Sequence, residues 1–356
     1  MKRDLTIEDV EPALIGGAIL GGGGGGIVET GRDAVRVAME VGTPQLWSAD
    51  EFAADDLTAT IALVGAPAAP DPMVLPRHML RTLELLREQL PAGRKLAAVH
   101  CNENGAYTTF NGWLHSALTG LPVIDFACNG RAQPTSVMGG MGLHLREGYQ
   151  SLQAFAGGHP ESYVEGVLTG NLEGTSALVR QASEHAGGWI GVARNPVTVE
   201  YAVENGAPGA ISQAIELGRV HIEGGVEATA EHLGGRIVTE GTVTDYRCVQ
   251  AGGRDHGLVS LDDAGATTVH FINEYMVLDH DGSRVARFPE LIMTFAEDGR
   301  PVTSGEIGPG DRITVMVAPV ENLILSKTMF MPDLYEPLEK AIGFSFAPAA
   351  GEPVHA

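Results

Sequence analysis

The 356-residue sequence predicts an α/β domain with a mainly parallel sheet, joined to a second, β-rich domain. In the first half of the chain, apolar strand-like runs alternate with stretches of helical apolar spacing, as in βαβ units. From Gly234 onward the apolar runs become short and are separated by Gly, Asp and Pro, which favours a β-rich domain. We place the domains at residues 1–222 and 223–346 and expect a frayed tail at residues 347–356.

Apolar spacing defines the elements of the first domain. Two amphipathic stretches, Ile7–Leu20 and Val28–Val41, predict helices on either side of a run of glycines. The strands that follow are expected at Thr58–Gly65, Lys95–Cys101 and Leu121–Cys128, and the helices at Leu75–Leu90, Tyr107–Leu118, Leu172–Glu184 and Pro208–His221. A glycine-rich segment, residues 139–170, precedes Leu172. Ligands of parallel sheets bind beyond the carboxyl ends of the strands, which are here Gly65–Pro67, Cys101–Gly105 and Asp125–Arg131.

The second domain, of roughly 100 residues, has a common domain size. Its strands are expected at Arg236–Asp245, Thr267–Leu278, Gly282–Pro289, Glu290–Ala296 and Arg312–Val317.

The glycine run, Gly21–Gly26, lies between the first two predicted helices. Glycine adopts positive φ angles and lets a ligand approach the main chain, and the following helix presents free N–H groups. We therefore expect Gly23, Gly24 and Gly25 to bind substrate. A flexible connector is the alternative interpretation. The run is not a nucleotide-binding signature, because it lacks the Gly-Lys-Ser/Thr ending and does not follow a strand.

The segment after the second predicted strand gathers several reactive groups. Glu103 is a candidate general base or metal ligand. His100, Cys101 and Cys128 are weak candidates for metal ligands. Adjacent residues of a strand point to opposite faces, so at most one of His100 and Cys101 should face the site. A small buried core residue is the alternative for Cys101. Asn104 is expected to contact the substrate.

Two further segments contain candidate site residues. Asp125 lies in an apolar strand and needs a partner or a ligand there, while Arg131 offers donors to a substrate carboxylate or carbonyl. An ion pair between the two is the alternative. In the β-rich domain, Asn273 and Glu274 are expected on opposite faces of one strand, so that one of them points away from whatever the other contacts.

Charge and cysteine content limit the classes of function. A net charge of −22, without a basic stripe, argues against binding to nucleic acid or an anionic membrane. Three widely spaced cysteines, Cys101, Cys128 and Cys248, indicate a reducing compartment without a disulfide framework. The acidic N-terminus disfavours a signal peptide. We therefore expect a cytoplasmic protein, and a homo-oligomer because such assemblies are common among cytoplasmic proteins of this type.

The motifs, in this order, resemble those of the S-methyl thiohydantoin desulfurase family over nearly the whole chain. The resemblance rests on Leu20 with its glycine run, Gly65-Ala66-Pro67, Pro122-Val123-Ile124-Asp125, Gly130-Arg131-Ala132 with Pro134, Gly209–Ala214, Asn273-Glu274, Phe288–Ile292 and Gly310–Ile313. The family implies an α/β domain and a β-rich domain with a small-molecule site between them, and its members often accompany hydantoinase/oxoprolinase-type enzymes. Such an enzyme is therefore an expected partner.

The chain departs from the family pattern at two carboxylates. Ala127 and Thr135 stand where the family has Asp and Glu, and Ala106 replaces a glycine after Glu103. Cys128 and Asn129 lie beside the first departure.

Three functions follow from this resemblance. In the first, the glycine loop and Arg131 hold the polar ring of a thiohydantoin or hydantoin and its acidic substituent, and Gly65, Ala66 and Asn129 also contact the substrate. Glu103 or Asp125 activates water to expel sulfur, and a divalent metal such as zinc is a candidate electrophile. In the second, the protein is a ring-amide hydrolase with Cys128 as nucleophile and His100 as base. In the third, it is a binding or accessory subunit without turnover.

Overall fold

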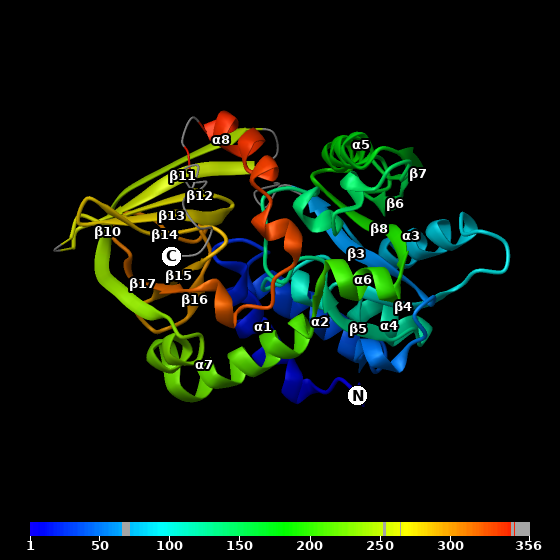
Figure 1. Cartoon of the computed structure of the whole chain (residues 1–356), viewed down its shortest axis with the longest axis horizontal. Coiled ribbons are helices and arrows are strands. Elements are labelled where there is room, and N and C mark those ends of the chain that lie inside the picture. The colour runs from blue at the N-terminus through cyan, green and yellow to red at the C-terminus, as the bar shows by residue number, and fades with distance from the viewer. Residues whose placement is uncertain (66–71, 252–253, 264, 343–344, 346–356) are drawn as a thin grey trace.

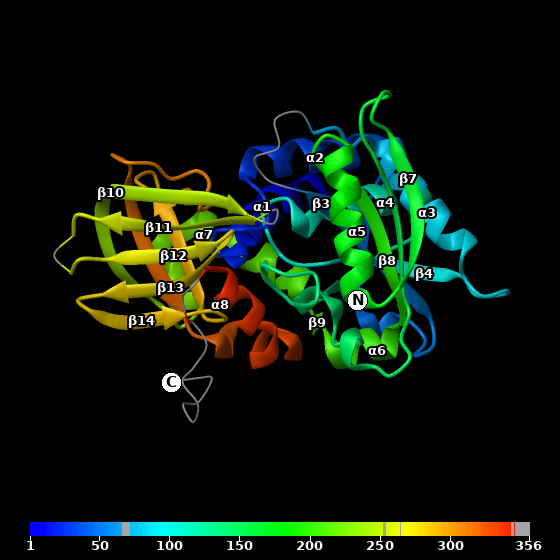
Figure 2. The same cartoon turned by 90° about the horizontal axis from the view of Figure 1, so that it is seen from above.

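The chain folds around two sheets that lie side by side, as Figures 1 and 2 show. This computed structural model describes residues 1–65, 72–251, 254–263, 265–342 and 345. Ala66 and the expected tail at residues 347–356 lie outside the described residues. Among the described residues, none of the helices has the length and apolar character that crossing a membrane requires.

The first sheet is mixed. Its spatial order is β1 (Lys2–Asp4), β2 (Gln45–Trp47), β5 (Val123–Ala127), β4 (Leu96–Cys101), β3 (Leu57–Gly65), β8 (Trp189–Thr198), β6 (Ser151–Gly157) and β7 (Val164–Gly170), with β9 (Ala207–Pro208) beside β5. The pairs among β2, β5, β4 and β3 are parallel, and the other pairs are antiparallel. The α/β class is confirmed, but the parallel arrangement holds only at the centre of the sheet. The glycine-rich segment hides the strand pattern of β6 and β7.

The helices of this part agree with the predicted positions in most cases. They are α1 (Ile7–Gly21), α2 (Val28–Val41), α3 (Pro76–Glu88), α4 (Trp113–Thr119), α5 (Leu172–His185), α6 (Val199–Asn205) and α7 (Ala210–His232). The helix predicted at Tyr107–Leu118 is split. A short 3₁₀ turn, Thr108–Phe110, precedes α4, and Gly112 at φ 104° separates the two.

The second sheet is antiparallel in all its described pairs, which confirms the β-rich second domain. Its order is β14 (Ser283–Arg287), β13 (Glu274–His280), β12 (Thr268–Ile272), β11 (Arg254–Leu261), β10 (Arg236–Ala251), β17 (Arg312–Ala318), β15 (Leu291–Ala296) and β16 (Pro301–Val302). Helix α8 (Glu336–Ile342) follows it. The single strand predicted at Thr267–Leu278 breaks at Asn273, whose φ is 55°, because this residue turns β12 into β13.

Small residues let α1 and α7 pack closely. A Cβ atom on Gly16 would lie 1.8 Å from the carbonyl oxygen of Ala214, and one on Gly218 would lie 1.8 Å from that of Pro12. Both helices contribute to the core of each part, so this contact joins the two sheets. Helix α7 kinks at Gly225, just after our division at residue 222, and the division itself stays a prediction.

Candidate functional site

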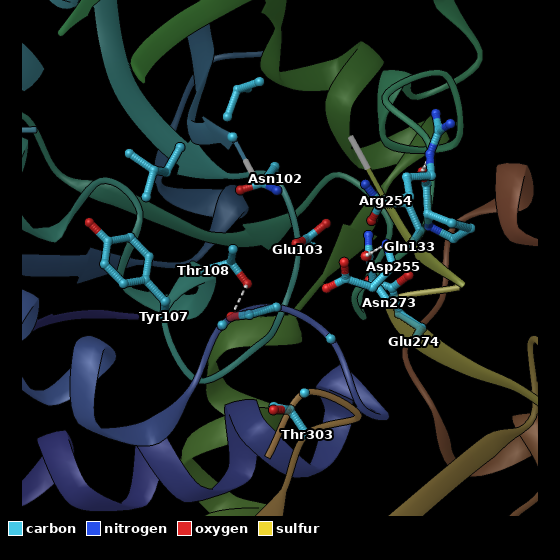
Figure 3. Close-up of a pocket in the computed structure, with 18 of the residues that line it drawn as sticks. Asn102, Glu103, Tyr107, Thr108, Gln133, Arg254, Asp255, Asn273, Glu274 and Thr303 are labelled. Carbon is cyan, nitrogen blue, oxygen red and sulfur yellow. Dashed lines mark hydrogen bonds between the residues drawn. The ribbon is translucent and has the colours of Figure 1, made fainter. Parts of the chain in front are cut away.

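A cavity of about 560 Å³ lies where the two parts meet. The α/β part contributes the glycine loop, the end of β3, the segment after β4, residues 133–136 and side chains from α5 and β8. The β-rich part contributes the start of β11, the β12–β13 turn and residues 303–306. Figure 3 shows side chains from both parts around this one space. Its volume suits a small molecule.

The glycine loop is held in place by hydrogen bonds from both parts. The carbonyl oxygens of Gly22 and Gly23 accept from the Tyr275 and Ser304 amides at 2.7 and 3.1 Å, and that of Gly25 accepts from the Tyr107 amide at 3.0 Å. These contacts support a fixed cavity wall more than a flexible connector.

The loop also has no room for side chains. Gly23, Gly25 and Gly26 have φ values of 93°, 78° and 90°. A Cβ atom on Gly24 would lie 2.2 Å from the Oε1 atom of Glu274. The run is glycine because of its backbone conformation and because the Glu274 carboxyl lies against it. Gly23, Gly24 and Gly25 all line the cavity, as does Gly65 at the end of β3.

Two carboxyl groups, one from each part, line the cavity at Glu103 and Glu274 (Figure 3). Both residues are buried. Burial raises the pKa of Glu103 to about 8, although Arg194 and hydrogen bonds involving Gln133 and Asn102 act to lower it. Burial, reinforced by the charge of Glu103, raises the pKa of Glu274 to about 8. Two carboxyl groups whose environments oppose ionisation are typical of acid–base sites.

The two carboxyl groups differ in their hydrogen bonds. Glu103 interacts with Gln133 and Asn102. The Oε2 atom of Glu274 has no hydrogen-bond partner among the described residues. Arg131 and Arg254 favour the ionised form of Glu274 only through space.

Arginine side chains form another part of the cavity wall: Arg180 from α5, Arg194 from β8 and Arg254 from β11. Arg194 is 5% exposed. Its guanidinium makes no hydrogen bond or ion pair with any residue that the structure describes. Arg254 donates from Nε to the carbonyl oxygen of Pro134 at 2.7 Å. Tyr107 and Trp189, with ring centroids 6.2 Å apart, add an aromatic surface.

The structure places Asp125 away from the cavity. Its carboxylate accepts hydrogen bonds from the backbone amides of Ile211 and Ser212, at 3.1 and 3.0 Å, and from the Ser212 hydroxyl at 2.6 Å. These are free amides of the first turn of α7, so the carboxylate caps that helix. A buried acid in an apolar strand does need partners, as the sequence indicates, but they belong to a helix and not to a ligand.

Arg131 is fully buried behind the glycine loop and does not line the cavity. Its Nη1 atom donates to the carbonyl oxygens of Pro289 and Glu290 at 3.1 and 2.8 Å, and its guanidinium lies 5.0 Å from the centre of the Phe288 ring. It joins the two parts and does not pair with Asp125.

Two predicted amide contacts are structural as well. Asn104 donates to the carbonyl oxygens of Gly130 and Ala210, and Asn129 bonds to Gln133. Asn273, in contrast, lines the cavity together with Glu274. Their expected separation onto opposite faces does not occur, because the positive φ of Asn273 ends the strand between them.

The candidate metal ligands are core residues. His100 lies between the Thr58 and Thr60 hydroxyls at 2.8 and 2.9 Å, and burial lowers its pKa to about 3. Cys101 and Cys128 are fully buried, and burial raises the pKa of Cys128 to about 11. In the part of the chain that the structure describes, no three His, Cys, Asp or Glu side chains are grouped to hold a metal ion. These residues do not fit a metal centre.

The sequence did not indicate Asn102, Tyr107, Gln133 and Trp189 as cavity residues. It also did not indicate Arg180, Arg194 and Arg254, which we call the arginine wall. Arg194 carried a usable signal, because it is a charged residue directly after the apolar run Ile190–Ala193. No sequence pattern indicates that Arg180 and Arg254 lie near one another, since they belong to elements far apart in the chain.

The fold and the cavity define a two-domain protein with a site of small-molecule size between its parts. Two family models match the chain: the S-Me-THD-like N-terminal domain at residues 8–156 and the S-Me-THD-like C-terminal domain at residues 171–330. The chain therefore belongs to the S-Me-THD-like family, as its motifs predicted.

A solved structure of a protein from Chromobacterium violaceum has the same fold. The TM-score is 0.76 at 22% sequence identity, and the match covers 95% of this chain and 97% of that one. No curated protein matches the chain.

Proposed function

We propose that the protein is a hydrolytic desulfurase that acts on a small heterocycle of the thiohydantoin or hydantoin type. Family membership motivates the substrate class. The observation that carries the proposal is the pair of buried carboxyl groups, Glu103 and Glu274, contributed by different domains to one cavity. The site thus has two carboxyl groups, although Ala127 and Thr135 stand where the family pattern has Asp and Glu.

The surroundings of the pair assign the roles. Glu103 is the general base, because Arg194 and the hydrogen bonds involving Gln133 and Asn102 favour its ionised form. Glu274 is the general acid, because its Oε2 atom lacks a partner among the described residues and the charge of Glu103 opposes its ionisation. The two groups then share one proton in the active state.

The reaction replaces the ring C–S bond by a C=O bond. Glu103 removes a proton from water, whose oxygen attacks the ring carbon that carries sulfur. The tetrahedral intermediate collapses to the carbonyl and expels the sulfur group as a thiolate. Glu274 donates its proton to that sulfur and regains one from the attacking hydroxyl as the C=O bond forms, while the proton taken by Glu103 passes to the ring nitrogen. Water and the S-substituted ring thus yield the oxo ring and a thiol.

The glycine loop supplies a main-chain surface for the ring. Gly23, Gly24 and Gly25 line the cavity beside Glu274, so a flat substrate can lie against the backbone there. A divalent metal is not needed for this scheme.

Ring-amide hydrolysis is the competing reaction. Cys128 does not line the cavity and its thiol has a raised pKa, which disfavours it as a nucleophile. The competing reaction would therefore use the same carboxyl pair.

The test is release of sulfide or methanethiol from a panel of thiohydantoins and S-methyl thiohydantoins by purified protein, with and without zinc. We expect thiol release, with the oxo ring intact in the product. Ring opening without thiol release would establish the amide hydrolase instead. No reaction from a well-folded sample, together with co-purification of a hydantoinase-like chain, would establish the accessory subunit.

A further inference from the structure

The arginine wall stands out against the charge of the whole chain. The protein has a net charge of −22, yet three of its arginines, Arg180, Arg194 and Arg254, line one cavity. Burial lowers the pKa of Arg180, and the charges of Arg254 and Arg194 lower it further while that of Glu184 raises it, so the three cations lie close enough to interact electrostatically. Like charges brought together in a buried site are costly unless an anion joins them.

The acidic residues of the cavity do not neutralise this wall. Glu103 and Glu274 have pKa values of about 8, so both are mainly protonated at neutral pH. Glu306 pairs with Arg300 at 3.2 Å and accepts from the Thr303 amide and hydroxyl at 2.9 Å. Asp255 is the remaining acidic residue of the lining. Among the described residues, none of these acidic side chains forms a hydrogen bond or ion pair with Arg194.

Arg194 is the residue of this wall that points most directly to an anionic ligand. It is almost fully buried, lines the cavity, and makes no hydrogen bond or ion pair with the described residues. A buried guanidinium with five N–H donors and no acceptor is unfavourable unless a ligand supplies the acceptor. A carboxylate matches these donors best, because a guanidinium binds both of its oxygens at once.

We propose that Arg194, with Arg254 and Arg180, forms an anion subsite that binds a carboxylate on the substrate. The subsite lies beside the carboxyl pair, so it selects ring substrates with an acidic side chain and fixes the ring against Glu103 and Glu274. This inference rests on the cavity being the substrate site of the proposed function, but not on the reaction that takes place there.

The test compares two ligands that differ only in charge: hydantoin-5-acetic acid and its primary amide. Dissociation constants are measured by calorimetry at pH 7, without turnover. We expect wild-type protein to bind the acid about tenfold or more tightly than the amide, as a charge-assisted bidentate contact allows. Arg194→Gln should remove this preference by weakening the acid and not the amide, and Arg194→Lys should retain part of it.

Arg36→Gln is the matched control, because Arg36 is exposed and pairs only with Asp33 and Glu40 on its own helix among the described residues. It should bind both ligands as the wild type does. Circular dichroism checks folding, and if Arg194→Gln fails to fold, Arg254→Gln replaces it. Equal affinities in the wild type, no binding of the acid, or a preference that survives both variants would overturn the subsite. If the protein prefers the acid but releases no thiol, the subsite is supported and the proposed desulfurase reaction is contradicted.

Discussion

At the scale of single residues, the site depends on carboxyl groups that are alike in chemistry and different in surroundings. Glu103 and Glu274 line the cavity with raised pKa values, whereas Asp125 caps α7 through three hydrogen bonds. Burial alone does not distinguish a catalytic acid from a structural one. The partners of each oxygen do.

Removing either cavity carboxyl should abolish most of the thiol release. Glu103→Gln loses the base and Glu274→Gln the proton donor, so we expect kcat to fall on the order of a hundredfold in each. Steady-state kinetics at pH 8 measures this. Glu223→Gln, an exposed change on α7, is the control and should leave kcat unchanged. Full turnover in Glu103→Gln would show that Glu103 is not the base.

Asp125→Ala should reduce stability and leave the chemistry intact. The change leaves the first-turn amides of Ile211 and Ser212 without their acceptor, which costs about 1–2 kcal/mol at a helix N-terminus. Urea unfolding measures the loss, and kcat of the folded protein should stay within about threefold of wild type. A loss of kcat as large as that of Glu103→Gln would return Asp125 to the catalytic residues.

The sequence could predict only part of the site. Glu103, Glu274, Gly23, Gly24 and Gly25, which line the cavity, could be singled out because a polar group at a strand end and a glycine run each have a direct physical meaning. The arginine wall could not be predicted, since its members meet only when α5, β8 and β11 come together. The donors of Arg131 favour a ligand contact in the sequence, but the structure directs them to backbone carbonyls of the other part.

At the scale of elements, α1 and α7 determine how the two sheets are placed. Their contact at Gly16 and Gly218 leaves no room for a Cβ atom at either position. Because the glycine loop continues directly from α1, a shift of this helix would move Gly24 away from Glu274. Helix packing far from the cavity therefore sets the geometry within it.

A side chain at Gly218 should separate these helices. The new Cβ atom of Gly218→Val would lie 1.8 Å from the carbonyl oxygen of Pro12, so we expect a loss of about 2 kcal/mol or more in the free energy of unfolding. Gly308→Ala is the control, because the nearest atom to its Cβ lies 3.8 Å away. Equal stability of the two variants would contradict the packing described here.

Most helices and the parallel strands β3, β4 and β5 were predictable because their apolar spacing reports directly on burial. Strands β6, β7 and β8 were not, although β8 is central to the sheet. Residues 139–170 are rich in glycine, which obscures the alternation of β6 and β7. The break between β12 and β13 depends on the positive φ of Asn273, which residue type alone does not reveal.

At the scale of the whole molecule, the buried acids should couple stability to pH. Glu103 and Glu274 have pKa values of about 8 in the folded protein and an ordinary value of 4.5. The unfolded chain therefore releases these protons first, and their contribution to stability is full below about pH 4.5 and is lost as the pH rises to about 8. Buried histidines act in the opposite direction below pH 6.5, so only a difference between variants isolates the acids.

The double variant Glu103→Gln/Glu274→Gln removes the contribution of both carboxyl groups to the pH dependence of the free energy of unfolding. Relative to wild type, its free energy of unfolding should increase between pH 5 and pH 8 by roughly 7 kcal/mol, since each of the two groups contributes up to about 1.4 kcal/mol for each pH unit. Urea unfolding at each pH measures the difference. A difference that does not vary with pH would mean that the two carboxyl groups ionise normally in the folded protein.

The pH dependence of thiol release tests the central claim most directly, because it reports on the carboxyl pair during the reaction. The active state needs Glu103 ionised and Glu274 protonated, so kcat/KM for an S-methyl thiohydantoin should follow a bell with its maximum near pH 8. Glu274→Gln should remove the alkaline limb from its residual activity. A profile that is flat from pH 6 to 9, or that peaks near pH 5, would contradict the account.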